Sequence, residues 1–514
     1  MKVTQLISPG PLGDSIAFFA GILLVFAFAP FALSPLAVLS TTTLLALILS
    51  INAKQALWRG WLFGLGLFGA GVYWIYISIH TFGHTPAWLA LSITFAFISL
   101  LAFFPALSCY LLNRYFPITT DSKLLCAFPA IWVMLEWVRS WLFTGFPWLT
   151  LGDSQINSPL KGFAPLFSTY GISLIVLCSS GFLCNAWRKI QQKNYSAFAA
   201  NLGGCILIWI IGASLSLVSW TSPEGPPIQV SLVQGNIAQD DKWSYDQVDP
   251  TLKRYADLTA PHWNSQLIVW PESAIPIPLQ NAQGYVNILD ATAKKHNAAL
   301  ITGIPIRDRL QNDYFNGIIA VGKNTNDYYL KRRLVPFGEY IPFPTITARF
   351  MNWWNIPMSN FIRANAIKQT MQVNGLTIEA FICYEIAFAE QVFSRDSHIN
   401  LLLTINNDAW FGESIAQAQH LAMAQMRALE MGRPLLFVSN TGITAIIQPN
   451  GKIQSAAPPY QPYVLTDTIQ PVHGLTPWQH NKLDPVLLIA LIFILKPLLQ
   501  QRKQRKKNES TRNG

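Results

Sequence analysis

The chain has 514 residues, more than one hydrophobic core normally supports, so at least two structural regions are expected. Half of the residues (51%) are hydrophobic and only 12% are charged, which argues against an ordinary soluble protein and is typical of a chain that lies partly in lipid. The net charge of +10 does not indicate a nucleic-acid partner, because Lys and Arg occur in short clusters beside hydrophobic segments and at the C-terminus.

Seven apolar segments, each about the twenty residues that a helix needs to cross a bilayer, precede residue 222. They cover residues 14–32, 34–51, 57–79, 87–112, 124–143, 163–187 and 198–219. A shorter apolar segment, 486–499, is followed by a basic tail and is counted as an eighth span. The first segment has no small-residue cleavage site after it, so we expect it to be a retained anchor rather than a removed signal.

Lys and Arg are concentrated in alternate loops between these segments. The residues concerned are Lys2, Lys54, Arg59, Arg114, Lys123, Arg188, Lys189 and Lys193. The intervening loops carry almost none, so the positive-inside rule predicts a cytoplasmic N-terminus. The chain after residue 219 is therefore expected to emerge outside the cytoplasm and to return through the last span to a basic, disordered cytoplasmic tail at 502–514.

Residues 222–482 have a different texture, with short β-rich runs separated by turns and amphipathic stretches, as in an α/β domain of about 260 residues. The predicted strands are 229–234, 266–270, 299–303, 316–321, 376–382, 400–405 and 435–439. Residues 417–431 have a helical pattern, and Pro449-Asn450-Gly451 predicts a hairpin turn. The expected domains are thus a membrane region at 1–221, this domain, and a final span at 483–501.

Cys383 follows the apolar run 376–382 directly, so it is predicted to lie where a strand ends and a turn or helix begins. Reactive nucleophiles often occupy such positions. By itself, however, a lone Cys beside Phe and Ile is more often an inert buried side chain. The other five cysteines lie in apolar segments, and their spacing predicts neither a disulfide framework nor a zinc site.

Two further ionisable residues of this domain stand next to apolar runs or turns. Glu272 follows Trp270-Pro271, and Lys331 opens the run Lys-Arg-Arg-Leu-Val-Pro-Phe-Gly-Glu. A carboxylate that accepts the thiol proton, an ammonium that stabilises an oxyanion and a thiol that attacks a carbonyl can together perform acyl transfer. Spacing alone does not establish a catalytic role for either residue, since Glu272 could cap a helix and Lys331 could be a solvated surface charge.

Glu, Lys and Cys in this order, in Trp-Pro-Glu, Pro-Phe-Gly-Glu and Cys-Tyr-Glu contexts, resemble the nitrilase superfamily, and more narrowly the apolipoprotein N-acyltransferase family. The resemblance covers nearly the whole chain. Its other motifs are Val233-Gln-Gly-Asn-Ile237, Tyr314-Phe-Asn316, Asn406-Asn-Asp-Ala-Trp-Phe-Gly412 and Arg427-Ala-Leu-Glu-Met-Gly-Arg-Pro434. It implies an αββα nitrilase-like sandwich inserted before the last of about eight spans.

The resemblance assigns roles to individual positions. It implies that Glu272 is the general base, Lys331 the electrostatic stabiliser and Cys383 the nucleophile that carries an acyl thioester. The residues implied to support them or bind substrate are Trp243, Asn316, Glu339, Tyr384 and Glu385. It implies no cofactor and no metal.

The same resemblance implies partners and a location. The expected acyl donor is a phospholipid, with phosphatidylethanolamine favoured, and the acceptor is a diacylglyceryl apolipoprotein. The location implied is the bacterial inner membrane, with the catalytic domain in the periplasm. Two alternatives remain at this point: a membrane-tethered amidase that hydrolyses a small substrate, and a transporter or scaffold whose outer domain only binds.

Two further features stand out. Residues 341–365 are unusually aromatic, and with Trp353 and Trp354 they are expected to form a lid or an arm that dips into the membrane, although packing on the domain core is an alternative. Glu136 and Arg139 lie three residues apart, on one face of a predicted span. A mutual ion pair or snorkelling would explain them, but charges within a span favour a functional role in placing the domain or its lipid.

Overall fold

The computed structural model describes residues 10–308, 313–340, 361–364, 370–481 and 484–512. The chain forms two compact units. The helical unit comprises Met1–Tyr73, Leu91–Val218 and Asn481–Gly514, and the α/β unit comprises Trp74–Ala90 and Ser219–His480. The sequence did not predict the excursion at 74–90, which interrupts an apolar segment expected to be one span.

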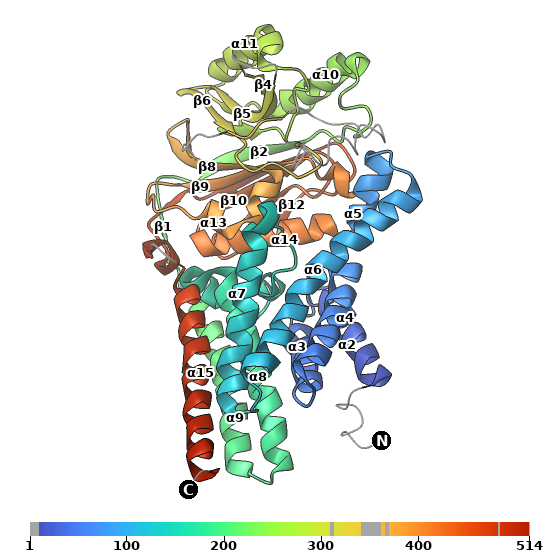
Figure 1. Ribbon diagram of the computed structural model, residues 1–514. Coiled ribbons are helices and arrows are strands. Elements are labelled where there is room, and N and C mark those ends of the chain that lie inside the picture. The colour runs from blue at the N-terminus through green and yellow to red at the C-terminus, as the bar shows by residue number, and fades with distance from the viewer. Residues whose placement is uncertain (1–9, 309–312, 341–360, 365–369, 482–483, 513–514) are drawn as a thin grey trace. The chain divides into compact units, whose positions relative to one another are not determined.

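Helices account for nearly all of the described part of the helical unit (Figure 1). They are α2 (Pro11–Val25), α3 (Pro35–Ile48), α4 (Ala53–Gly71), α6 (Ala87–Tyr115), α7 (Phe128–Trp141), α8 (Ala164–Gln191), α9 (Tyr195–Leu215) and α15 (Pro485–Arg512). Among the residues that the structure describes, four helical stretches are long and apolar enough to cross a membrane: Ala87–Tyr115, Lys123–Thr144, Pro159–Gln191 and Tyr195–Leu215. The protein is therefore a membrane protein with about four such helices.

The expected count of eight spans is not confirmed. Helices α2 and α3 have 15 and 14 residues, which at 1.5 Å per residue is about 20 Å and short of a bilayer core of about 30 Å. Pro30 and Pro35 lie in and just after the connection between them, and proline cannot continue a helical hydrogen-bond ladder. Helix α4 is followed, after a 53° bend, by α5 (Trp74–Ile77) and the π-helix Ser78–Phe82, so residues 57–79 are a broken segment.

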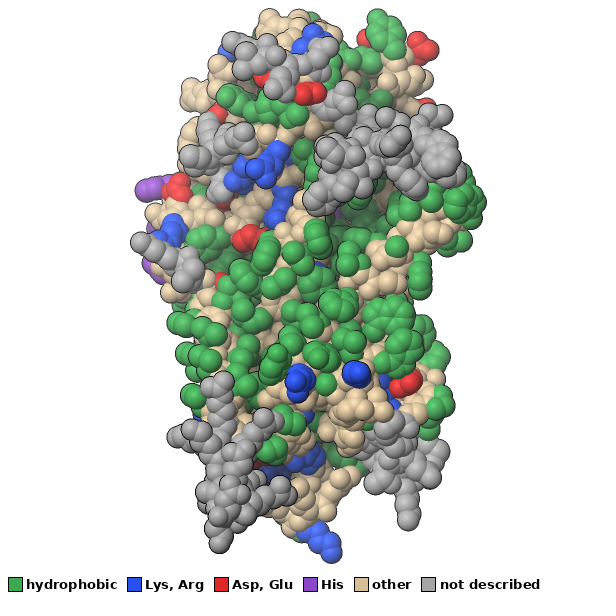
Figure 2. All heavy atoms as spheres, viewed as in Figure 1, with side chains coloured by type: hydrophobic (Ala, Val, Ile, Leu, Met, Phe, Trp, Pro, Cys, Tyr) green, Lys and Arg blue, Asp and Glu red, His purple; other side chains and the backbone are tan. Residues whose placement is uncertain are grey.

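Large hydrophobic side chains are exposed on the long helices, and they cover most of the visible face of the helical unit in Figure 2. Those on α6, α9 and α15 include Leu91, Phe95, Phe103, Ile206, Leu207, Ile210, Ile492 and Leu495. So much exposed apolar surface is compatible with lipid as the surrounding solvent. The expected disorder beyond Gln501 is wrong, because α15 continues as a helix to Arg512.

The α/β unit is built on a 12-stranded sheet with the order β12-β11-β10-β9-β8-β7-β6-β5-β4-β3-β2-β13. The strands are β2 (Ile228–Gln234), β3 (Leu267–Val269), β4 (Ala299–Arg307), β5 (Tyr314–Gly322), β6 (Thr325–Leu330), β7 (Thr370–Val373), β8 (Leu376–Ile382), β9 (Leu401–Asn406), β10 (Leu435–Ser439), β11 (Ala445–Ile447), β12 (Ile453–Ala456) and β13 (Tyr463–Ile469). The short strands β1 (Ser222–Pro223) and β14 (Val472–His473) form a separate pair. Strands β2, β3 and β4 are parallel, as are β8, β9 and β10.

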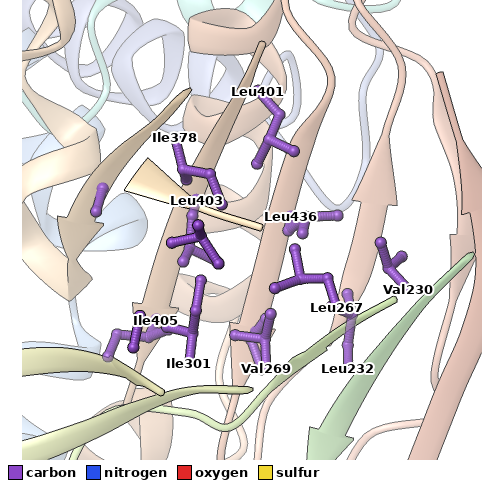
Figure 3. Packing of buried hydrophobic residues seen from close by; sticks show 14 of the residues in the cluster. Val230, Leu232, Leu267, Val269, Ile301, Ile378, Leu401, Leu403, Ile405 and Leu436 are labelled. Carbon is purple, nitrogen blue, oxygen red and sulfur yellow. The ribbon is translucent and has the colours of Figure 1, made fainter. Parts of the chain in front are cut away.

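The two halves of this sheet pack face to face, and α helices cover both outer faces (Figure 1). In the inner core, Val230, Leu232 and Val269 of one half meet residues such as Leu403 and Leu436 of the other (Figure 3). The alternate residues of β2 to β4 face outward onto α10 (Val248–Thr259) and α11 (Leu279–Lys295). Helix α14 (Ala416–Met431) lies beside the opposite face (Figure 1). These four layers are the predicted αββα sandwich.

Candidate active site

Cys383 lies at the predicted transition, directly after β8 and at the first position of the short 3-10 helix Cys383–Ala387. Its backbone φ is +52°, a left-handed conformation that non-glycine residues seldom adopt. The side chain is partly accessible. Strained backbone conformations cluster at active sites, although strain alone does not define a function.

Glu272, Asn316 and Glu339 form a polar network with Lys331. Lys331 follows β6 and is 1% exposed, and its Nζ donates to Glu339 Oε1 at 2.8 Å and to Glu272 Oε1 at 3.4 Å. Asn316 on β5 donates from Nδ2 to Glu272 Oε1 at 2.7 Å and to Glu339 Oε1 at 3.0 Å. The structure therefore brings Glu272, Asn316, Lys331 and Glu339 together, from three separate stretches of sequence.

The charges of this network act on Cys383. Burial raises the pKa of the Cys383 thiol well above its usual range, and the carboxylate of Glu272 raises it further, whereas the Lys331 ammonium acts in the opposite direction. Burial alone would lower the pKa of Lys331, but the carboxylates of Glu272 and Glu339 outweigh it and raise that pKa. Burial thus favours the neutral thiol and the two carboxylates favour the ammonium form of Lys331, and attack by sulfur requires a base.

Glu385 connects the Cys383 turn to the Lys331 segment. Its side chain is fully buried and accepts hydrogen bonds from the backbone amides of Ile382, Arg332 and Arg333 at 2.9, 2.7 and 3.0 Å. The Tyr329 hydroxyl and the Gln391 amide also donate to it. Glu385 is thus placed to fix the spacing between the thiol and the ammonium group.

Lys242 is a residue of the site that the sequence did not reveal. Its side chain is 3% exposed, and Nζ donates to the backbone carbonyl of Glu272 at 2.8 Å. Burial lowers the pKa of Lys242 to about 8, against the opposing charges of Glu272 and Cys383. In the sequence it follows Asp240 and Asp241, a context typical of a solvated loop, so no local pattern could have indicated it.

The remaining predicted site residues lie elsewhere or outside the described residues. Trp243 is half exposed, and Tyr384 is buried with its ring edge-on to Phe388, at a centroid distance of 4.8 Å. Trp353, Trp354 and most of the aromatic segment 341–365 fall outside the described residues. Among the residues that the structure describes, no group of His, Cys, Asp and Glu side chains is arranged to bind a metal ion.

Glu136 and Arg139 of the helical unit both contact the loop that follows their helix, α7. Glu136 Oε1 accepts from the Leu151 amide at 2.9 Å and from Trp132 Nε1 at 3.1 Å. Arg139 Nη1 donates to the carbonyls of Phe146 and Trp148. Both side chains are buried, so the snorkelling alternative is wrong, and their contacts stabilise the loop at 146–151.

Known proteins share both parts of this chain. Residues 229–474 match the carbon-nitrogen hydrolase family model, the class of protein that the four-layer fold defines. Residues 20–182 match the model of the apolipoprotein N-acyltransferase N-terminal domain. The chain is 45% identical over 487 residues to an apolipoprotein N-acyltransferase of Coxiella burnetii, covering 94% of this chain and 99% of that protein. It is 39% identical to one of Pseudomonas putida, over 95% of this chain and 96% of that protein. The chain therefore belongs to the apolipoprotein N-acyltransferase family.

Solved structures resemble about half of the chain. A CN-hydrolase superfamily protein of Xanthomonas campestris is 19% identical, with a TM-score of 0.37, and covers 48% of this chain and 91% of its own. The Nit3 protein of Saccharomyces cerevisiae, a member of the nitrilase superfamily, is 16% identical, with a TM-score of 0.38, and covers 49% and 93%.

Proposed function

We propose that this protein transfers a fatty acyl chain from a membrane phospholipid, through a thioester on Cys383, to the N-terminal amino group of diacylglyceryl-cysteine in apolipoproteins. The observation that carries this proposal is the position of the Lys331 ammonium. It forms ion pairs with Glu272 and Glu339, and its charge acts against the burial that raises the pKa of the Cys383 thiol. Membership in the apolipoprotein N-acyltransferase family supplies the class of acceptor.

In the first half-reaction, Cys383 Sγ attacks the ester carbonyl of the phospholipid as Glu272 accepts the thiol proton. A carbon–sulfur bond forms, and the carbonyl oxygen becomes an oxyanion that the Lys331 ammonium stabilises. The ester carbon–oxygen bond then breaks, and Glu272 returns the proton to the leaving oxygen of the lysophospholipid. Burial raises the pKa of the thiol and so favours its neutral form, which fits transfer of the proton to Glu272 as the sulfur attacks.

In the second half-reaction, the free amine of the lipoprotein attacks the thioester carbonyl. Glu272 accepts a proton from the attacking nitrogen, an amide bond forms, and the carbon–sulfur bond breaks as Glu272 passes that proton to the sulfur, which regenerates the thiol. Lys331 stabilises the oxyanion again, since the second intermediate carries its charge on the same oxygen. Hydrolysis of the thioester by water would compete with this step, so the site has to favour the amine.

The same proposal includes a position in the cell. We assign residues 222–482 to the periplasmic side of the bacterial inner membrane, with a membrane region at 1–221, a final span at 483–501 and a basic cytoplasmic end at 502–514. The bias of Lys and Arg toward alternate loops supports this orientation. The membrane anchor suits a donor such as phosphatidylethanolamine, whose acyl chains do not readily leave the bilayer. An eight-span arrangement would require three shorter apolar helices, α2, α3 and Pro485–Gln501, and the bent pair Ala53–Gly71 and Trp74–Phe82 to cross as well.

A transfer assay tests the proposed function directly. Purified protein in phosphatidylethanolamine vesicles receives a synthetic diacylated lipopeptide with either a free or an acetylated amino terminus. The expected result is a triacylated peptide from the free amine alone, with no product from Cys383→Ala. Release of free fatty acid at the same rate with both peptides would instead support the amidase-type hydrolase.

A further inference from the structure

A buried histidine contacts the backbone carbonyl of Cys383, and a buried aspartate contacts the histidine. The proposed reaction uses neither of them. Asp408 follows β9 in the 3-10 turn Asp408–Phe411, and His420 lies on α14. Both side chains are fully buried. His420 Nδ1 is 3.0 Å from Asp408 Oδ1, and Nε2 is 3.2 Å from the Cys383 carbonyl oxygen.

The partners of the His420 ring show that Nε2 carries a proton. A carbonyl oxygen can only accept a hydrogen bond, so Nε2 has to donate to it. This remains true whether the proton shared with Asp408 resides on Nδ1 or on the carboxyl group. The pair therefore presents one N–H donor to the main chain of Cys383.

The orientation of the histidine ring is fixed by packing. Phe411 and Phe437 contact the ring edge-on, with centroid distances of 6.0 Å and 5.3 Å. Phe411 in turn packs against Trp74, at 4.7 Å, and Ser439 Oγ lies 3.3 Å from Asp408 Oδ2. A ring confined in this way cannot turn away from Cys383 without disrupting its neighbours.

The main chain of Cys383 needs such support. Its left-handed φ of +52° is unfavourable for a residue with a side chain, by about 1–2 kcal/mol. Relaxation to an ordinary conformation would rotate the Cα–Cβ bond and redirect the sulfur. A hydrogen bond to the Cys383 carbonyl opposes that rotation.

We propose that His420 and Asp408 are positioning residues that hold the Cys383 backbone so that its sulfur faces Glu272 and Lys331. This inference rests on the proposed function, because it takes Cys383 to be the nucleophile. It explains why Asp408 of the Asn-Asn-Asp-Ala-Trp-Phe-Gly motif lies near Cys383 without entering the Lys331 network.

The test compares two variants of similar size in the full-length protein, His420→Gln and His420→Met. Glutamine can direct an N–H toward the Cys383 carbonyl, whereas methionine cannot. The probe is p-nitrophenyl butyrate, which would acylate Cys383 with a burst of p-nitrophenolate and needs no phospholipid. We expect His420→Met to slow acylation at saturating ester by about 100-fold with little change in the apparent KM, as for a misaligned nucleophile. His420→Gln should stay within about tenfold of the wild type.

Several results would overturn the inference: a His420→Met burst at the wild-type rate, equal losses in both variants, or no burst in the wild type. Should neither variant fold, Asp408→Ala provides the test. It removes the carboxylate that contacts His420 Nδ1, and the alanine itself carries no charge. It should slow acylation by about tenfold, the effect expected of a lost orienting partner, and an unchanged rate would also overturn the inference. A wild type that reacts with the activated ester but not with phospholipid would refute the proposed function alone.

Discussion

Lys331 is the residue on which the charge balance of the site depends. It is the cation that contacts both Glu272 and Glu339, and its charge opposes the other influences that keep the Cys383 thiol protonated. In the proposed reaction it also stabilises an oxyanion that exists only after the sulfur has attacked. Its contribution to catalysis should therefore appear mainly in the rate of the chemical step.

Replacing Lys331 by Met should reduce acylation by at least about 100- to 1000-fold, as for the loss of an oxyanion donor. It should also lower the thermal unfolding midpoint, since breaking a buried ion pair typically costs about 3–5 kcal/mol. Acylation of Cys383 per folded molecule, with folding followed by circular dichroism, provides the measurement.

Arg332→Met is the matched control for this substitution. The Arg332 side chain donates to the Tyr329 hydroxyl, while its contact with Glu385 is made by the backbone amide and survives the substitution. Acylation should fall by less than about tenfold, the effect of an outer contact. Equal losses in the two variants would contradict the assigned role of Lys331.

The burial of Lys331 illustrates what local sequence could not provide. A Lys-Arg-Arg triplet is by default a solvated group of charges, and only the resemblance distinguished its first residue. The decisive contacts come from Glu272, Asn316 and Glu339, which tertiary folding brings together. Lys242 and His420 escaped notice for the same reason, since each contacts a backbone carbonyl of a distant residue, which no sequence pattern marks.

At the scale of elements, the ends of the strands position the proposed catalytic residues. Glu272, Lys331 and Cys383 follow β3, β6 and β8. Seven of the strands were predicted within a few residues, because a period of two and the flanking turns are local signals, whereas β6, β7, β11, β12 and β13 were not predicted. The first two apolar segments were predicted to be longer than helices α2 and α3, because hydrophobicity does not reveal where a proline-containing turn ends a helix.

Gly303 on β4 shows how tightly a strand can support the site. Its amide donates to Pro271 O and its carbonyl accepts from the Ile275 amide, both at 3.2 Å. A Cβ at this position would lie 2.5 Å from the Ser273 nitrogen and 2.8 Å from the Glu272 Cα. Gly303→Ala should therefore displace Glu272, destabilise the fold by about 1–3 kcal/mol and slow acylation about 100-fold.

Gly284→Ala is the control for that substitution. Gly284 lies within α11, and a Cβ there would meet no atom within 4 Å. Alanine in a helix interior should stabilise the protein by about 0.5–1 kcal/mol and leave acylation unchanged. Thermal unfolding and the burst assay measure both variants, and normal acylation by Gly303→Ala would show that Glu272 does not depend on this contact.

At the scale of the whole molecule, the orientation in the membrane determines which substrates the site can meet. The distribution of Lys and Arg predicts that both ends of the chain are cytoplasmic and that the α/β unit is exported. An alkaline phosphatase fusion near residue 260 should be active, and one after Gln501 inactive. The opposite pattern would reverse the orientation and remove a periplasmic lipoprotein from the possible acceptors.

The central claim is that Cys383 carries the acyl chain between donor and acceptor. Mass spectrometry of the purified protein, incubated with phosphatidylethanolamine but no acceptor, tests it most directly, because the first half-reaction needs only the donor. We predict a fatty acyl adduct on the peptide that contains Cys383, sensitive to hydroxylamine, absent from Cys383→Ala and lost when a diacylated lipopeptide with a free amine is added. Absence of the adduct, or its loss in buffer as fast as with lipopeptide, would contradict the account.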